Sequence, residues 1–250
     1  MITEIEIEVP PESIAQKNYL LIEAAYLLQL DLSDITAVLP IRRSIDSRGN
    51  KPVYKVLARV FINEEPHELY PKVNYEPVKS KERAIIVGNG PAGMFTALRL
   101  IELGIKPIII ERGKDVQERR KDIRLLQQDQ IVNPNSNYCF GEGGAGTYSD
   151  GKLYTRSTKR GNVKKILQVF VQHGAKEEIL IDTHPHIGSN KLPLIIKAMR
   201  ETIINNGGEV QFNSLVTDLI IKNEKVLGVV VNDDKEILGD CVVLAVGHSA

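Results

Sequence analysis

The chain has 250 residues, of which 42% are apolar and 26% charged, and its formal net charge is zero. These values are typical of a globular protein with one or two domains, and neutrality gives no electrostatic case for nucleic acid or an anionic membrane as a partner. No apolar run reaches the roughly 18 residues that a membrane-spanning helix needs. The chain begins without the basic and apolar regions of a signal peptide, and its two cysteines, Cys139 and Cys241, lie outside any C-x-x-C pair. We therefore expect a cytoplasmic protein without disulfides or membrane contact.

Residues 1–63 are expected to form a small α+β domain with the order strand, helix, strand, strand. Apolar and acidic residues alternate over residues 4–9, which predicts a half-exposed strand. Helical spacing follows over residues 12–30. Residues 35–45 and 53–62 then predict two strands of a hairpin.

A basic cluster, Arg42, Arg43 and Arg48, lies in this hairpin and raises the possibility of an RNA-binding face. However, residues 1–80 contain nine Lys and Arg against twelve Asp and Glu. We therefore interpret the cluster as a solvated hairpin or an interdomain contact and expect no nucleic-acid partner. Residues 64–82, rich in proline and charge, are interpreted as a linker.

The most informative stretch runs from Arg83 to Glu111. An apolar strand leads into Gly88-Asn89-Gly90-Pro91-Ala92-Gly93, a helix is expected over residues 94–103, and a second apolar strand ends at the acid Glu111. The three glycines allow the tight turn, the approach of a pyrophosphate and close helix packing, while the acid suits a ribose hydroxyl and repels a 2′-phosphate. This combination predicts an adenine-dinucleotide site. The alternative is a doubly wound fold that holds no dinucleotide.

A second glycine-rich stretch covers residues 138–153. Five of the eleven residues from Gly141 to Gly151 are glycine, and aromatic residues flank them. Such a loop can bring backbone N–H groups against a planar or phosphorylated ligand, and the flanking aromatics disfavour an exposed linker.

The other elements follow from periodicity and turn residues. Helices are expected over residues 115–130, 161–174 and from 189 or 190 to about 206. Strands are expected over residues 179–182, 209–212, 216–222, 226–232, 236–238 and 240–247. The last strands before residue 240 are interpreted as a β-meander.

Together these pieces resemble the FAD-binding domain of the glutathione-reductase-like flavoprotein superfamily. Residues 85–93 are similar to its strand and turn at the ADP pyrophosphate, and Glu111 to its ribose-binding acid. Residues 209–212, the meander and residues 243–247 are similar to its third strand, crossover and last motif, with Val246 where threonine is usual. Residues 140–153 and 43–48 resemble the bacterial NAD/FAD-utilising dehydrogenases of this superfamily.

The resemblance implies an α/β, Rossmann-like FAD-binding domain with a β-meander crossover over residues 83–250, with a segment inserted at about residues 114–190. It also implies a longer protein, whose C-terminal half would be a partner of this portion. The residues expected to bind FAD are Gly88, Gly90, Pro91, Ala92, Gly93, Glu111, Arg112, Gly143, Gly144, Ala145, Gly146, Thr147, Val216 and Gly247.

The expected activity is that of an FAD-dependent dehydrogenase, transferring hydride through flavin N5 to or from a small-molecule substrate, with NAD(P)H as a candidate partner. Candidate catalytic residues are His184, His186 and Lys152, against the alternative that they are ordinary loop residues. No metal site is expected. The alternatives are an FAD-containing binding or regulatory module and a flavin-dependent RNA-modifying enzyme.

Overall fold

The structure of the chain is a computed structural model, and it describes residues 1–16, 18–155, 159 and 161–248. It divides into two compact units, each built from two separate stretches of chain. The first unit is Met1–Lys72 with Lys152–Ile187, and the second is Val73–Gly151 with Gly188–Ala250. The expected α/β class is confirmed, because the described residues form one parallel and two antiparallel sheets. The division differs from the expected boundaries, because part of the expected insertion packs with the N-terminal domain.

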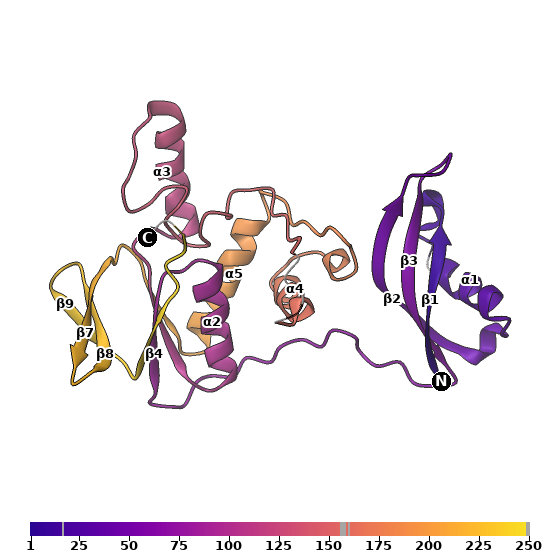
Figure 1. Cartoon of the computed structure of the whole chain (residues 1–250), viewed down its shortest axis with the longest axis horizontal. Helices are drawn as coiled ribbons and strands as arrows, with labels where there is room; N and C mark the ends of the chain where they lie inside the picture. Colours follow the sequence, from indigo (N-terminus) through magenta and orange to yellow (C-terminus); the bar gives the residue numbers. More distant parts are fainter. Residues whose placement is uncertain (17, 156–158, 160, 249–250) are drawn as a thin grey trace. The chain divides into compact units, whose positions relative to one another are not determined.

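The first unit contains an antiparallel sheet in the order β1-β3-β2, covered on one face by α1 (Figure 1). Its strands are β1 (Ile2–Val9), β2 (Ile35–Asp46) and β3 (Val53–Ile62). Alternate strand residues such as Ile7 and Val56 are buried against the helix, as the period of two requires.

The helix of this unit is shorter than the expected range of residues 12–30. Pro11–Ser13 form a 3-10 helix, η1, and α1 spans only Tyr19–Leu28. The fixed φ of Pro11 suits the short η1, and α1 ends where Gln29 takes a left-handed conformation. Lys17, inside the expected range, lies outside the described residues.

The second stretch of the first unit contains α4 (Val163–Gln172) and a 3-10 helix, η3 (Glu177–Leu180). The strand expected over residues 179–182 is therefore wrong, because a short apolar run does not by itself separate strand from helix. Only Asp182 makes a parallel bridge, to Arg43 of β2. The Arg43 N–H donates to the Ile181 carbonyl at 2.7 Å and its Nε to Asp182 Oδ1 at 2.7 Å, which joins this stretch to the N-terminal sheet.

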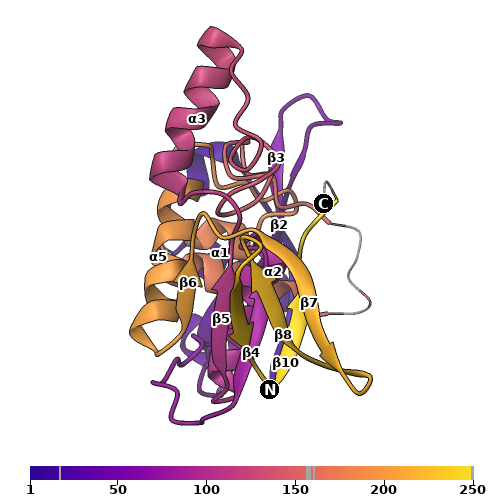
Figure 2. The same ribbon diagram turned by 90° about the vertical axis from the view of Figure 1, so that its left-hand side faces the viewer.

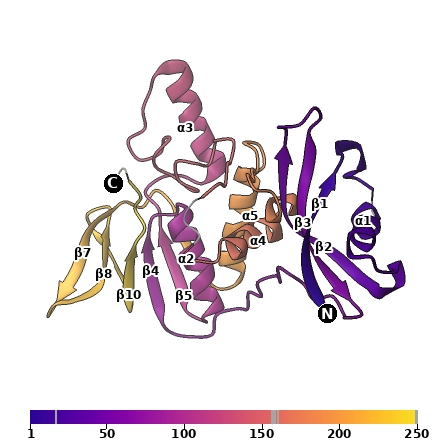
Figure 3. The same ribbon diagram turned by 45° about the vertical axis from the view of Figure 1, so that its right-hand side comes forward.

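The second unit is built on a parallel sheet in the order β10-β4-β5-β6. On one face α2 (Pro91–Glu102) packs against β4 and β5, and α5 (Leu192–Asn205) packs against α2 (Figure 3). The strands are β4 (Arg83–Val87), β5 (Lys106–Ile110), β6 (Glu209–Gln211) and β10 (Cys241–Leu244).

The expected β-meander is confirmed as the sheet β7-β8-β9, which lies beside the parallel sheet in Figure 2. Its strands are β7 (Val216–Lys222), β8 (Lys225–Val231) and β9 (Lys235–Leu238). Val229 and Val231 of β8 form one buried cluster with Ile85 and Ile108 of the parallel sheet. Ile86 faces α2 instead, so the parallel sheet is covered on both faces. The remaining helix, α3 (Val116–Asp129), starts after β5 and supports the glycine-rich loop.

Candidate functional site

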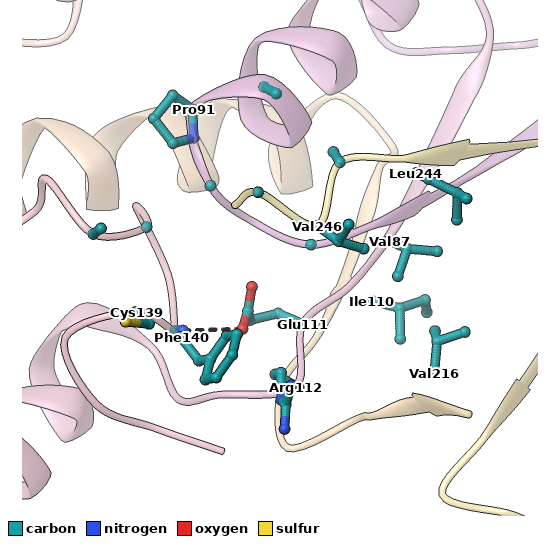
Figure 4. Close-up of a pocket in the computed structure, with 18 of the residues that line it drawn as sticks. Val87, Pro91, Ile110, Glu111, Arg112, Cys139, Phe140, Val216, Leu244 and Val246 are labelled. Atoms are coloured by element: carbon teal, nitrogen blue, oxygen red, sulfur yellow. Dashed lines mark hydrogen bonds between the residues drawn. The ribbon is translucent and has the colours of Figure 1, made fainter. Parts of the chain in front are cut away.

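A cavity of about 510 Å³ lies in the second unit, where β4, β5 and β10 end (Figure 4). Ligands of open parallel sheets bind outside the carboxyl ends of the strands, which is where this cavity lies. Its walls come from these strand ends, the start of α2, the glycine-rich loop and the approach to β7. The lining residues are Val87, Gly88, Gly90, Pro91, Ala92, Ile110, Glu111, Arg112, Cys139, Phe140, Gly141, Gly144, Ala145, Ser214, Leu215, Val216, Leu244, Ala245, Val246, Gly247 and His248.

The turn between β4 and α2 needs glycine at two positions. Gly88 has φ of +102°, and a Cβ there would lie 2.6 Å from the Ala245 carbonyl oxygen. A Cβ on Gly93 would lie 2.0 Å from the Gly88 carbonyl oxygen. The turn therefore stays tight and brings the start of α2 to the cavity wall. Pro91 has no N–H, so Ala92 is the residue of the first turn that offers a backbone N–H to the cavity, at the positive end of the helix dipole.

The Glu111 carboxylate, 4% exposed, connects the end of β5 to both glycine motifs. Its Oε2 accepts from the Asn89 N–H at 2.7 Å, while Oε1 accepts from the N–H groups of Gly113 at 2.8 Å and Gly141 at 3.1 Å. A carboxylate has about four lone-pair positions, so it retains acceptor capacity for a hydroxyl in the cavity.

The next residue, Arg112, forms a flat wall with Phe140. Its guanidinium carbon lies 4.0 Å from the centre of the Phe140 ring, and Nη2 donates to Asn135 Oδ1 at 2.8 Å. Both residues line the cavity, so they offer a planar, cationic surface to a ligand.

Arg119 of α3 is fully buried beneath the glycine-rich loop. It donates to the carbonyl oxygens of Asn137 (2.9 Å), Tyr138 (3.0 Å), Gly141 (3.2 Å), Glu142 (2.7 Å) and Gly144 (2.9 Å), and to Thr147 Oγ1 (3.2 Å). Among the described residues, no carboxylate lies within ion-pair distance of it. Burial lowers the pKa of Arg119 from its ordinary value, although a guanidinium stays charged in proteins.

A buried acid lies in the same loop. Glu142 is 0% exposed, and its Oε2 accepts from the Val116 N–H at 2.8 Å and from Arg200 Nη1 at 3.0 Å. Burial raises the pKa of Glu142 to about 7, against the opposing effect of the Val116 N–H and Arg200.

Sequence reasoning missed Arg119 and Glu142 as functional residues. Arg119 starts the run Arg119-Arg120-Lys121, which has the pattern of a solvated helix face. Glu142 lies among glycines, where an acid is normally exposed. The sequence contains no signal that separates Arg119 from its exposed neighbour Arg120.

Most of the expected FAD-binding residues line the cavity: Gly88, Gly90, Pro91, Ala92, Glu111, Arg112, Gly144, Ala145, Val216 and Gly247. Gly93, Gly143 and Thr147 are buried and do not line the cavity. The Gly143 N–H donates to the Asn89 carbonyl at 2.8 Å, and the Thr147 hydroxyl donates to the carbonyls of Glu142 and Gly144. Gly146 is exposed beside Ala145.

The catalytic candidates belong to the first unit. Lys152 and His186 form an antiparallel bridge, and the His184 ring lies 4.9 Å from the Tyr154 ring. Their catalytic role stays a prediction. Of the two cysteines, which are both free and exposed, Cys139 lines the cavity.

Two features are absent from the described part of the chain. No group of three or more His, Cys, Asp and Glu side chains there is placed to hold a metal ion. No helix in those same residues combines the length and apolar character needed to cross a membrane.

The chain has relatives of known sequence. It is 36% identical over 239 residues to a Clostridium beijerinckii protein described as "Uncharacterized protein", a match that covers 89% of this chain and 44% of the relative. It is 26% identical over 193 residues to the thiamine thiazole synthase of Aeropyrum pernix, covering 70% of this chain and 59% of that protein. The chain thus spans less than two thirds of either relative.

Residues 1–61 match a family described as a domain of unknown function, DUF8436. The solved structure of Thermovibrio ammonificans THI4 aligns with 67% of this chain and 58% of its own, with a TM-score of 0.43 and 16% sequence identity.

Proposed function

We propose that the cavity of the second unit binds FAD and that the whole protein is an FAD-dependent oxidoreductase. The observation that carries this proposal is the placement of Glu111 and the α2 N-terminus on one cavity, at the carboxyl ends of β4 and β5. Free N–H groups and the positive end of a helix dipole favour a pyrophosphate, and an acid at the end of the second strand favours a ribose hydroxyl.

The residues present suit the ADP half of FAD. Gly88 to Ala92 would hold the pyrophosphate, Glu111 would accept from the ribose, and the Arg112–Phe140 wall offers a stacking surface. The negative charge of Glu111 disfavours a 2′-phosphate, so NADP is a poor ligand for this cavity. The approach to β7, through Leu215 and Val216, completes the apolar lining.

Bound flavin would supply hydride transfer through its N5 atom, while the protein binds, orients and shields it. The proposal also includes a small-molecule substrate and a nicotinamide electron donor. It keeps Lys152, His184 and His186 as candidate catalytic residues. Two free, exposed cysteines support a reducing compartment such as the cytoplasm.

The test is the visible absorption spectrum of the purified protein at full length, followed by anaerobic addition of NADH or NADPH. Flavin bands that bleach with either nucleotide support an oxidoreductase. Flavin bands that bleach only with a chemical reductant support the alternative of a binding or regulatory module that contains FAD. A colourless protein that takes up no added FAD contradicts the proposal.

A further inference from the structure

The peptide between Gly144 and Ala145 has a fixed direction in the structure. The Gly144 carbonyl accepts from Arg119 Nη1 at 2.9 Å and from Thr147 Oγ1 at 2.9 Å, so it points into the protein. In a trans peptide the carbonyl and the following N–H point in opposite directions. The Ala145 N–H therefore points away from Arg119. Ala145 is exposed and lines the cavity, and no described residue accepts from its N–H.

This peptide faces the turn that starts α2. A Cβ built on Gly144 would lie 3.1 Å from Pro91 Cδ and 3.4 Å from Gly90 Cα. The Gly143 N–H also donates to the Asn89 carbonyl at 2.8 Å. The loop and the α2 N-terminus thus form two adjoining walls, and Ala145 of the loop and Ala92 of the helix both line the cavity.

We infer that Arg119 is a positioning residue for the phosphates of the ligand: it holds the glycine-rich loop so that the Ala145 N–H faces the cavity. The inference rests on the proposed function, because it concerns the same cavity. Arg119 does not itself line the cavity. Its effect passes through the glycine-rich loop. The N–H groups of Arg119 donate to carbonyl oxygens of this loop, where a buried arginine would otherwise pair with a carboxylate.

Arginine is required here rather than any cation. Its planar guanidinium has five N–H donors in a rigid fork, and in this structure they reach six acceptors spread from Asn137 to Thr147. Lysine has three donors at a single nitrogen, so it keeps the charge but leaves buried carbonyls unpaired. Arg119→Lys therefore removes the planar arrangement of five donors and keeps the positive charge.

The experiment compares the full-length protein with its Arg119→Lys and Arg120→Lys variants. Arg120 is the neighbouring, exposed arginine and serves as the matched control. Two quantities are measured: the FAD dissociation constant by absorbance titration, and amide hydrogen exchange over residues 137–147 and over β4 without ligand. A third variant, Arg119→Ala, is titrated with FAD in the presence and absence of methylguanidinium, which can occupy the vacated space.

We expect Arg120→Lys to behave as the parent protein and Arg119→Lys to bind FAD at least about tenfold more weakly. Exchange over residues 137–147 should accelerate in Arg119→Lys while β4 stays protected, and methylguanidinium should restore part of the FAD affinity of Arg119→Ala. Unchanged FAD affinity in Arg119→Lys overturns the inference. Faster exchange in β4 as well as in the loop also overturns it, because the role would then be general stability.

Failure of the proposed function gives a different result. If the parent protein binds no FAD, the proposal that the cavity binds FAD is wrong. The hydrogen-exchange comparison still decides whether Arg119 holds the loop, because it needs no ligand.

Discussion

The Gly141 N–H donates to Glu111 Oε1 at 3.1 Å, a contact between the end of β5 and the glycine-rich loop. It joins two sequence motifs that are recognisable separately, the dinucleotide turn with its acid and the loop of residues 138–153. Because the same carboxylate also accepts from Asn89 and Gly113, Glu111 has a structural role besides the ribose contact proposed for it.

Glu111→Gln should therefore weaken both stability and FAD binding. The amide NH₂ of glutamine would face at least one backbone N–H, leaving donors unpaired in a buried site. We expect a loss of about 1–3 kcal/mol in the free energy of unfolding, measured by urea denaturation. Glu118→Gln is the control, since Glu118 makes an exposed pair with Lys121 and should change stability by less than about 1 kcal/mol. Equal effects of the two substitutions would contradict this role.

Gly90→Ala and Gly93→Ala should separate ligand binding from folding. A Cβ on Gly90 has only Gly144 Cα as a neighbour, at 3.9 Å, whereas on Gly93 it would lie 2.0 Å from the Gly88 carbonyl oxygen. We expect Gly93→Ala to lose about 1–3 kcal/mol of stability or more. Gly90→Ala should keep its thermal midpoint but bind FAD more weakly, because its methyl group stands at the cavity wall. An unstable Gly90→Ala, or a stable Gly93→Ala, would show that this turn is packed differently.

Glu142 should make stability depend on pH. Its pKa rises from 4.5 to about 7 on folding, so between these values the folded state holds a proton that the unfolded state has released. Stability should therefore fall as the pH rises through this window, by roughly 3 kcal/mol in total. Urea denaturation at about pH 5 and about pH 8 measures it.

Glu142→Gln is the matched variant for that measurement, because it keeps the shape and cannot titrate. The difference in unfolding free energy between the two pH values should shrink in Glu142→Gln relative to the parent protein. The same pH dependence in both proteins would assign it to other groups.

Arg43→Ala should loosen the second stretch of the first unit. Its pair with Asp182 is partly buried, with side chains 21% and 32% exposed, and we expect a loss of about 1 kcal/mol. Hydrogen exchange at the Thr183 N–H, which donates to the Arg43 carbonyl, should accelerate. Arg42→Ala is the control, because its contact with Glu6 is 4.0 Å long and exposed. If Arg42→Ala accelerates exchange at the Thr183 N–H as much as Arg43→Ala does, the Arg43–Asp182 ion pair is not the cause.

Local pattern was sufficient to predict much of this fold. The strands of the N-terminal sheet, the β4–α2–β5 motif and the meander were recognisable because each has its own periodicity and turn residues. The cavity residues of the β4–α2 turn, and Glu111, were recognisable from the sequence for the same reason.

Features that depend on distant contacts could not be predicted. Arg43 and Asp182 are 139 residues apart, and nothing in either segment shows that they meet. Likewise Arg119 and Arg120 are equivalent by composition, and only the path of the loop decides that one is buried and the other solvated. The residues that hold the walls of the cavity were therefore harder to identify than those that line it.

The most direct test of the proposed FAD site is a titration of FAD into the full-length protein and its Gly90→Val variant, followed by visible absorbance. We expect the parent protein to bind FAD and Gly90→Val, folded by circular dichroism, to bind it far more weakly, because the valine side chain occupies the space at the α2 N-terminus. If both proteins bind FAD equally, the flavin lies elsewhere. If neither binds it, the cavity belongs to another nucleotide or to none.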